Sequence, residues 1–272
     1  MGSLVTALAS YLDARTHHGQ WLVRIEDLDP LRETDQARDQ ILTSLEVHGL
    51  KSDEPIRYQS QCLRRYANLI DELIKSGMAY PCACSRKQLK ANGGRHPNHC
   101  RDAPKHPPDE SPIAIRFALT EELHTWTDSL QGELTQRIHA ELDDPVIRRK
   151  EGFYSYQLAV VADDIDQNIT HVVRGADMLD LTPQQCQIYA CLGAEPPQWM
   201  HIPLVMNSDG QKLSKQNHAP ALDDTTPQAN LLTALNLLKQ DTIDLHTDQT
   251  VADILSRAAK RWDPARIHLT AR

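Results

Sequence analysis

Short apolar segments alternate with segments of helical period along most of this chain, which limits the folds open to it. Buried strands are predicted at residues 21–25, 171–174 and 199–206. Helices are predicted where apolar residues recur every three or four positions, at residues 3–15, 35–48, 63–76, 183–192, 227–239 and 251–262. Strands that alternate with helices favour an α/β fold built on a mostly parallel sheet.

The pattern changes between residues 79 and 150. This stretch holds three clustered cysteines, a proline-rich bend at residues 104–112 and the alternating run Ile113–Phe117. We therefore expect a module inserted into the α/β domain. The predicted parts are the first part of that domain at 1–78, the insert at 79–150, the second part at 151–225 and a short C-terminal helical region at 226–272.

The overall charge restricts the partners of the chain. Its 272 residues carry a net charge of −8, whereas a protein that coats nucleic acid without regard to sequence is usually basic. A shape-specific RNA partner that meets a local basic face stays open. The basic run Arg148–Lys150 could supply such a face, although a solvated surface explains it equally well.

No segment has the features of a membrane anchor or a targeting signal. No stretch approaches 18 apolar residues, and the apolar N-terminal residues lack the basic start of a signal peptide. We expect a cytoplasmic protein without a membrane partner. In that compartment, clustered cysteines indicate metal binding rather than a disulfide.

The cysteine cluster consists of Cys82, Cys84 and Cys100. A closed zinc site has four tetrahedral ligands, and His96 and His99 are both near enough along the chain to supply the fourth. Buried, reduced thiols without a metal are the alternative interpretation. If zinc binds, we expect it to be structural and to order the insert.

A turn-rich loop follows the last predicted strand and carries two lysines three residues apart. Asn207–Gly210 precedes the pentapeptide Lys212–Gln216, which is KLSKQ. Such a loop can swing over a triphosphate, and Lys215 can neutralise charge on a departing pyrophosphate. By composition alone, a surface loop that happens to carry two lysines is the simpler interpretation.

The pentapeptide resembles the KMSKS signature of the class I aminoacyl-tRNA synthetases. The longer segment Gln211–Ala219 (QKLSKQNHA) is more similar still to the glutamyl-queuosine tRNA(Asp) synthetases, which resemble a glutamyl-tRNA synthetase without its anticodon-binding half. Three other segments occur in the order that this family has: LVRIEDLD at 22–29, YQLAVVADD at 156–164 and HVVRGADML at 171–179. The resemblance runs from residue 1 to about residue 270.

The resemblance implies a class I synthetase core: a Rossmann-like parallel sheet, an inserted zinc-bearing subdomain of acceptor type and a short C-terminal helical region. It implies that glutamate is bound by Glu26, Tyr156 and Arg174. An arginine suits a carboxylate because its planar fork can bind both oxygens. Taken alone, Glu26 is as typical of a turn or a helix cap, and Arg174 of a structural ion pair.

The resemblance also implies which residues bind ATP and which bind the metal. Lys215 is expected to be catalytic, acting on the leaving phosphates of ATP and its Mg²⁺. The residues expected to bind ATP are Gly2, Ser3, Lys212 and Lys215. The family spacing favours His96 over His99 as the fourth metal ligand. One structural zinc ion per chain is then held by Cys82, Cys84, His96 and Cys100.

The implied reaction has two steps. The α-carboxylate of L-glutamate attacks the α-phosphate of Mg-ATP, so that glutamyl-adenylate forms and pyrophosphate leaves. The glutamyl group then passes to the queuosine base of tRNA(Asp), because residues 217–272 are too few for the helical region with which a glutamyl-tRNA synthetase reads an anticodon. Two alternatives stay open: a catalytic fragment of an ordinary glutamyl-tRNA synthetase, and a non-catalytic, zinc-stabilised relative that binds RNA. A monomer is expected.

One family signature is incomplete. Class I synthetases carry a HIGH-like motif at the end of their first strand, and Met1–Leu4 (MGSL) resembles only the tail of that motif. The first strand and the leading histidine are therefore expected to be missing. A mis-assigned start codon and a truncated, inactive descendant are the two explanations. The first is favoured because four expected site residues remain: Glu26, Tyr156, Arg174 and Lys215.

Overall fold

The structure is a computed structural model that describes residues 1–30, 34–93, 96, 99–102, 112–138, 144–206 and 222–268. Its helices are α1 (Gly2–Thr16), α2 (Asp35–Val47), α3 (Leu63–Lys75), α4 (Arg86–Ala91), α5 (Tyr156–Asp166), α6 (Thr182–Cys191), α7 (Pro227–Leu237) and α8 (Val251–Arg261). Its strands are β1 (Arg24–Ile25), β2 (Arg57–Tyr58), β3 (Ala79–Cys82), β4 (Ala114–Phe117), β5 (Glu122–Asp128), β6 (Gly132–Ile138), β7 (Val146–Arg148), β8 (His171–Gly175) and β9 (Gln198–Ile202). Its short 3₁₀ helices are η1 (Gln59–Gln61), η2 (Ala176–Leu181) and η4 (Pro264–Arg266).

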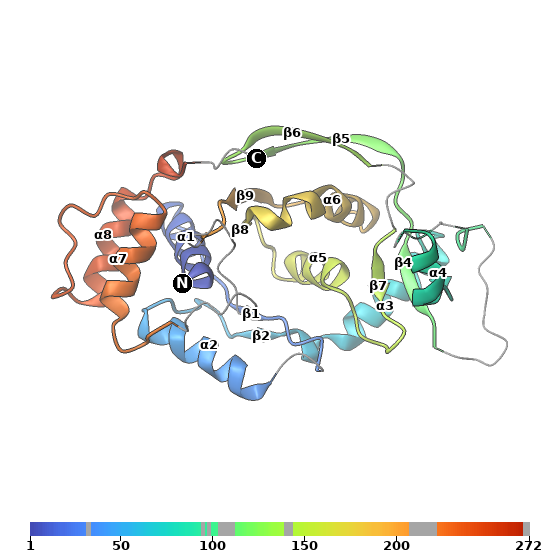
Figure 1. The fold of residues 1–272 in the computed structure, drawn as a ribbon, viewed down its shortest axis with the longest axis horizontal. Coiled ribbons are helices and arrows are strands. Elements are labelled where there is room, and N and C mark those ends of the chain that lie inside the picture. The colour runs from blue at the N-terminus through green and yellow to red at the C-terminus, as the bar shows by residue number, and fades with distance from the viewer. Residues whose placement is uncertain are drawn as a thin grey trace.

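Parallel strands occur in two separate sheets. β1 pairs with β2, and β8 pairs with β9 from His171 opposite Gln198 to Gly175 opposite Ile202. β9 is also parallel to β5, whose antiparallel partner β6 completes a sheet of order β6-β5-β9-β8. A third sheet, β3-β4-β7, is antiparallel and stands at the opposite end of the molecule from α7 and α8 (Figure 1). The predicted α/β fold with parallel strands is therefore confirmed.

One hydrophobic core lies between α1 and the C-terminal helices. Leu8 and Leu12, one helical turn apart on α1, pack with Leu231 of α7 and Ile254 of α8, and all four are fully buried. Ile202 of β9 joins the same cluster. Complete burial of each such side chain contributes about 1.5–3 kcal/mol. This core fixes α1 against the parallel strands.

A second core lies between α3, α5 and α6. α3 turns an apolar face inward, with Tyr66, Leu69, Ile70 and Leu73 buried. α5 is buried at every position from Gln157 to Asp164, so it runs through the interior between α3 and α6. Two adjacent acidic residues therefore lie inside the protein and need partners.

The first predicted strand, residues 21–25, is shorter than expected. Only Arg24–Ile25 pairs as a strand. Side chains take the backbone donors before it, because the N–H of Trp21 donates to Asp53 at 2.7 Å and that of Val23 donates to Ser52 at 3.1 Å. These two side chains and the backbone bond from the Asp53 N–H to the Trp21 carbonyl oxygen, at 2.9 Å, hold the start of this segment.

The other predicted elements agree closely with the structure. The strand expected at 199–206 is β9, which ends at Ile202 because Pro203 has no N–H to give to the ladder. The strand expected at 171–174 and the six predicted helices are present within two residues of their predicted bounds. None of the helices in the described ranges is long and apolar enough to cross a membrane.

Residues 79–150 do not stay in one sheet. β3, β4 and β7 pair with one another, whereas the hairpin β5–β6 leaves them and joins β9. The alternating run at 113–117 forms β4, all four of its residues are buried, and Ile115 and Phe117 pack into the second core. The buried Arg116 donates there from Nη1 to the backbone oxygen of Asp144 at 2.5 Å. The division of the chain at residues 78, 150 and 225 stays a prediction.

Replacing Gly49 with alanine is expected to lower the free energy of unfolding by about 2–5 kcal/mol. Gly49 has φ +71°, and a Cβ there would lie 2.7 Å from Val251 Cγ1 and 2.9 Å from Leu255 Cδ1 of α8. A left-handed backbone costs a non-glycine residue about 1–2 kcal/mol, and overpacking adds about 1–3 kcal/mol. Gly77→Ala is the matched control, since Gly77 has φ +75° and a Cβ there would meet no atom within 4 Å. Urea denaturation of both variants measures the difference. Equal losses of unfolding free energy would show that overlap with α8 does not cause the effect at Gly49.

Candidate active site and metal centre

A groove of about 1240 Å³ lies between α1, α2 and the segment around β1. Ser3 of α1, Glu26 just after β1 and Val173 of β8 all line it. One strand from each of the two separate parallel pairs, β1 and β8, therefore lines this groove. Ser3 and Glu26, which were assigned to ATP and to glutamate, meet there, and Gly2 directly precedes Ser3 at the start of α1.

Arg174 lies on β8, next to Val173 of the groove, and is only 8% exposed. Its guanidinium donates four hydrogen bonds: Nε to His201 Nε2 at 2.9 Å, Nη1 to Gln185 at 2.8 Å and to the Tyr156 hydroxyl at 3.4 Å, and Nη2 to Thr182 at 2.9 Å. A guanidinium has five N–H groups. Within the described part of the chain one N–H is left, so the expected two-bond fork to a carboxylate requires one of these bonds to open.

Two residues that the sequence did not single out, Asp128 and His201, support Arg174. Asp128 Oδ2 lies 2.6 Å from His201 Nδ1, and both side chains are buried. Burial acts to raise the pKa of Asp128, but hydrogen bonds from His201 and from the backbone N–H groups of Gln131 and Leu130 outweigh it, so the pKa lies below its ordinary value. A histidine within an apolar strand is the sequence signal that could have drawn attention to His201.

Tyr156 begins α5 and reaches Arg174 from that side. Burial raises the pKa of Tyr156, with the charge of Arg174 opposing the rise and the charge of Glu26 adding to it. The structure thus joins Tyr156 to Arg174 by a hydrogen bond and places Glu26 on the groove that Val173, the neighbour of Arg174, also lines. The roles of the three residues in binding stay predictions.

The two buried aspartates of α5 anchor the strands beside the groove. Asp164 accepts from Arg24 Nη2 of β1 at 2.8 Å. Asp163 accepts three hydrogen bonds, from Arg57 Nε at 2.9 Å, Gln59 Nε2 at 2.8 Å and the Tyr66 hydroxyl at 2.8 Å. Because Arg24 and Arg57 face each other in the β1–β2 pair, α5 holds both short strands in place.

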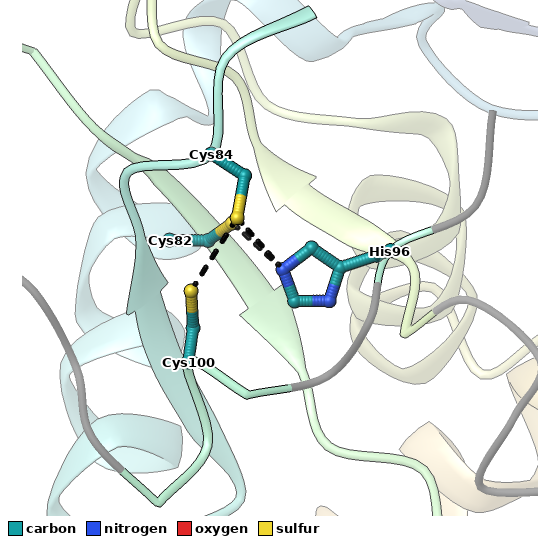
Figure 2. A group of neighbouring side chains, drawn as sticks. All are labelled: Cys82, Cys84, His96 and Cys100. Atoms are coloured by element: carbon teal, nitrogen blue, oxygen red, sulfur yellow. Dashed lines mark hydrogen bonds between the residues drawn. The ribbon is translucent and has the colours of Figure 1, made fainter. Parts of the chain in front are cut away.

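The predicted metal ligands converge at the end of β3. Figure 2 shows Cys82 and Cys84 facing His96 and Cys100, and the ligand atoms of all four buried residues lie within 4.8 Å of one another. Cys84 Sγ is 3.6 Å from Cys100 Sγ and 3.5 Å from His96 Nε2, and Cys82 Sγ is 3.1 Å from the same nitrogen. Tetrahedral zinc with bonds of about 2.0–2.3 Å places neighbouring ligand atoms about 3.5–3.8 Å apart. The cluster could therefore hold a metal ion.

His99 is the competing candidate for the fourth ligand. Its Nε2 is 3.7 Å from Cys84 Sγ, and its ring stacks on that of His96 with centroids 5.9 Å apart. However, His99 is exposed and stands outside the group of converging ligand atoms, whereas His96 is buried within it. The geometry therefore favours His96.

The protonation of the thiols bears on how a metal would bind. Burial raises the pKa of Cys100 to about 12, and the neighbouring Cys84 adds to the rise. Burial also raises the pKa of Cys84. A bound dication counteracts this effect because a coordinating thiol is deprotonated. Metal binding at this cluster is therefore coupled to the release of protons.

The two lysines assigned to ATP, Lys212 and Lys215, lie outside the described residues. The described chain reaches Met206 before them and resumes at Leu222 after them. The role of the KLSKQ loop therefore rests on the sequence alone.

Comparison with known proteins identifies the family. The family model "tRNA synthetases class I (E and Q), catalytic domain" matches residues 1–238. The chain is 46% identical over 266 residues to the glutamyl-Q tRNA(Asp) synthetase of Pseudomonas putida (strain GB-1), a match that covers 98% of this chain and 89% of that protein. It is 44% identical to the protein of the same name from Pseudomonas aeruginosa (strain LESB58), with 98% and 90% of the two chains covered.

Solved structures share the fold. The glutamate tRNA ligase of Elizabethkingia meningosepticum matches with a TM-score of 0.79 at 23% identity, over 98% of this chain. The chain spans 62% of that ligase, less than two thirds of its length, and at this identity the likeness concerns the fold alone. The chain therefore belongs to the class I aminoacyl-tRNA synthetases of the glutamyl and glutaminyl type, within the group of the glutamyl-Q tRNA(Asp) synthetases.

Proposed function

We propose that the chain activates L-glutamate with ATP and transfers the glutamyl group to the queuosine base of tRNA(Asp). The observation that carries this proposal is that Glu26 lines the same groove as Val173, whose neighbour Arg174 is hydrogen-bonded to Tyr156. The curated relatives of the chain are named glutamyl-Q tRNA(Asp) synthetases. A carboxylate, a hydroxyl and a buried guanidinium match the charges of glutamate, which has one ammonium group and two carboxylates.

The first step is the transfer of an adenylyl group. An α-carboxylate oxygen of glutamate attacks the α-phosphorus of Mg-ATP, the bond from that phosphorus to the bridging oxygen breaks, and pyrophosphate leaves. Glu26 pairs with the substrate ammonium, and Tyr156 and Arg174 bind the carboxylate that does not react. The groups proposed to contact ATP are those of Gly2, Ser3, Lys212 and Lys215, with Lys215 neutralising the leaving phosphates.

The second step moves the glutamyl group to RNA. A hydroxyl of the queuosine base attacks the carbonyl carbon of glutamyl-adenylate and loses its proton, the bond to the adenylate oxygen breaks, and AMP leaves. The protein contributes position rather than a nucleophile of its own. The names of the curated relatives support this choice of acceptor.

We propose that zinc occupies the cluster of Cys82, Cys84, His96 and Cys100. Three thiolates and one imidazole are a donor set typical of closed structural zinc sites, which leave no ligand position open for substrate. When bound, the ion supplies a cross-link between the end of β3 and the loop around Cys100. It orders the proposed tRNA-facing insert and takes no part in the chemistry.

Glutamate-dependent ATP–pyrophosphate exchange without tRNA is the expected activity of the chain. Arg174→Lys is expected to raise the KM for glutamate about tenfold to a hundredfold and to leave the KM for ATP nearly unchanged, because a lysine cannot hold the planar set of bonds that positions the guanidinium. Arg266→Lys, at an exposed arginine of η4, is the control and should change neither constant.

Two outcomes would replace the proposal with its alternatives. Exchange that appears only when tRNA is added would favour a catalytic fragment of an ordinary glutamyl-tRNA synthetase. Binding of tRNA and zinc without exchange under any condition would favour a non-catalytic relative. Labelled glutamate should be incorporated into tRNA(Asp) that carries queuosine, and not into tRNA(Asp) made in cells that lack queuosine. We propose that the chain acts as a monomer in the cytoplasm.

A further inference from the structure

We infer that Asp128 and His201 form a positioning pair that fixes the guanidinium of Arg174 for the substrate carboxylate. The inference rests on the proposed function, in which Arg174 binds glutamate. Its consequence is that the β5–β6 hairpin, which carries Asp128, takes part in substrate recognition without touching the substrate.

The pair forms one continuous chain of hydrogen bonds. Asp128 Oδ2 is 2.6 Å from His201 Nδ1, and Arg174 Nε donates to His201 Nε2 at 2.9 Å. Asp128 is 1% exposed and His201 is 0% exposed, so water does not compete for these bonds. The imidazole therefore links the carboxylate directly to one edge of the guanidinium.

The bonding pattern fixes the protonation of the imidazole. A guanidinium has only donors, so His201 Nε2 must carry a lone pair where Arg174 Nε points at it. The proton of a neutral imidazole then lies on Nδ1 and is donated to Asp128. Asp128 thus selects the one tautomer that can accept from Arg174.

The pair also supplies the charge that the buried guanidinium needs. The other three partners of Arg174 are neutral groups, on Gln185, Thr182 and Tyr156. A buried cation is costly without compensation. The negative charge of Asp128 polarises the imidazole, which makes Nε2 a stronger acceptor for Arg174.

Asp128 couples this arrangement to the tip of the hairpin. Its Oδ1 accepts from the backbone N–H groups of Leu130 at 3.0 Å and Gln131 at 2.9 Å, and its Oδ2 accepts from the N–H of His201 at 3.1 Å. The side chain of Gln131 adds a bond to the His201 carbonyl oxygen at 3.1 Å. The turn after β5 is therefore built around the same carboxylate that orients the imidazole.

Two substitutions of His201 separate positioning from folding. In His201→Gln, the longer amide can place its oxygen where Nε2 lies and still accept from Arg174. In His201→Asn, the shorter amide reaches only the Nδ1 position, so it can donate to Asp128 but not reach Arg174. The matched control is the pair His171→Asn and His171→Gln, at an exposed histidine of the same sheet.

We expect His201→Asn to raise both the KM and the calorimetric Kd for glutamate about tenfold to a hundredfold, with the KM for ATP unchanged. We expect His201→Gln to keep the KM and the Kd for glutamate within about threefold of the values of the unaltered chain. Both His171 variants should have the same values as the unaltered chain. Asp128→Asn keeps an acceptor oxygen but loses the charge. Its KM and Kd for glutamate should therefore lie between those of the two His201 variants. Melting curves verify that each variant is folded.

The outcomes separate this inference from the proposed function. If the unaltered chain binds glutamate and His201→Asn binds it equally well, the positioning pair is wrong and the proposed function stands. Equal weakening in His201→Asn and His201→Gln would also overturn the pair, because a purely structural role predicts no rescue by glutamine. If the unaltered chain does not bind glutamate, the proposed function and the role of the pair both fall.

Discussion

Replacing Asp163 with alanine is expected to lower the free energy of unfolding by about 3–5 kcal/mol, because the loss of one partner leaves buried charged and polar groups without compensation. The Asp163 side chain is 0% exposed and accepts from Arg57, Gln59 and Tyr66. These bonds connect α5 to β2, η1 and α3. Their loss should therefore loosen the segment beside the groove as well as the core. Urea denaturation followed by circular dichroism measures the change.

Asp166→Ala is the matched control for this prediction. Asp166 lies on the same helix and pairs with the same arginine, Arg57, at 3.0 Å, but its side chain is 25% exposed. A solvated ion pair contributes about 0–1 kcal/mol, so the control should lose little. Similar losses in the two variants would show that burial of Asp163 is not the source of the effect.

Removing the metal is expected to have the second large effect. If free zinc is a thousandfold above its Kd, binding stabilises the folded state by about 4 kcal/mol, and a chelator should remove that amount. Cys100→Ser, which deletes one of the four converging ligands, should lower zinc content well below one ion per chain and remove most of the stabilisation. Plasma mass spectrometry gives the zinc content, and thermal unfolding with and without chelator gives the stability.

Cys191→Ser is the control for the metal prediction. Cys191 is a half-buried free thiol at the end of α6, remote in sequence from the cluster. This variant should retain one zinc ion and the same response to chelator as the unaltered chain. A full-length chain that contains no zinc, or one that a chelator does not destabilise, would contradict the assignment of the cluster.

The helices were predictable because their signals are local. α3 repeats apolar residues at helical spacing and is followed by a glycine, so its bounds and buried face could be taken from the sequence. The cysteine cluster was predictable for a similar reason, since its ligands lie within about twenty residues and their type indicates a metal. Arg174 and Tyr156 were found by resemblance rather than by any local pattern.

The contacts that complete the site were not predictable from the sequence. Asp128 and His201 are 73 residues apart, and Arg57 and Asp163 are 106 residues apart. Within its own segment, each of these four residues is an ordinary polar residue. The first two become partners only because β5 pairs with β9, and the other two only because α5 packs beside β2. The four hydrogen bonds of Arg174 could not be predicted for the same reason, because the neighbours that accept them come from α5, α6 and β9. Its two-bond fork to a carboxylate stays a prediction.

The crowding of sulfur atoms at the end of β3 has a consequence for oxidation chemistry. The sulfurs of Cys84 and Cys100 are 3.6 Å apart, so a short closing movement lets an oxidant that accepts two electrons join them, with the loss of both thiol protons. A pair joined in this way can no longer coordinate a cation. A bound ion shields the thiolates from this reaction, and burial slows it in the free thiols by raising their pKa. A reducing environment is therefore a condition for keeping the cluster able to bind metal.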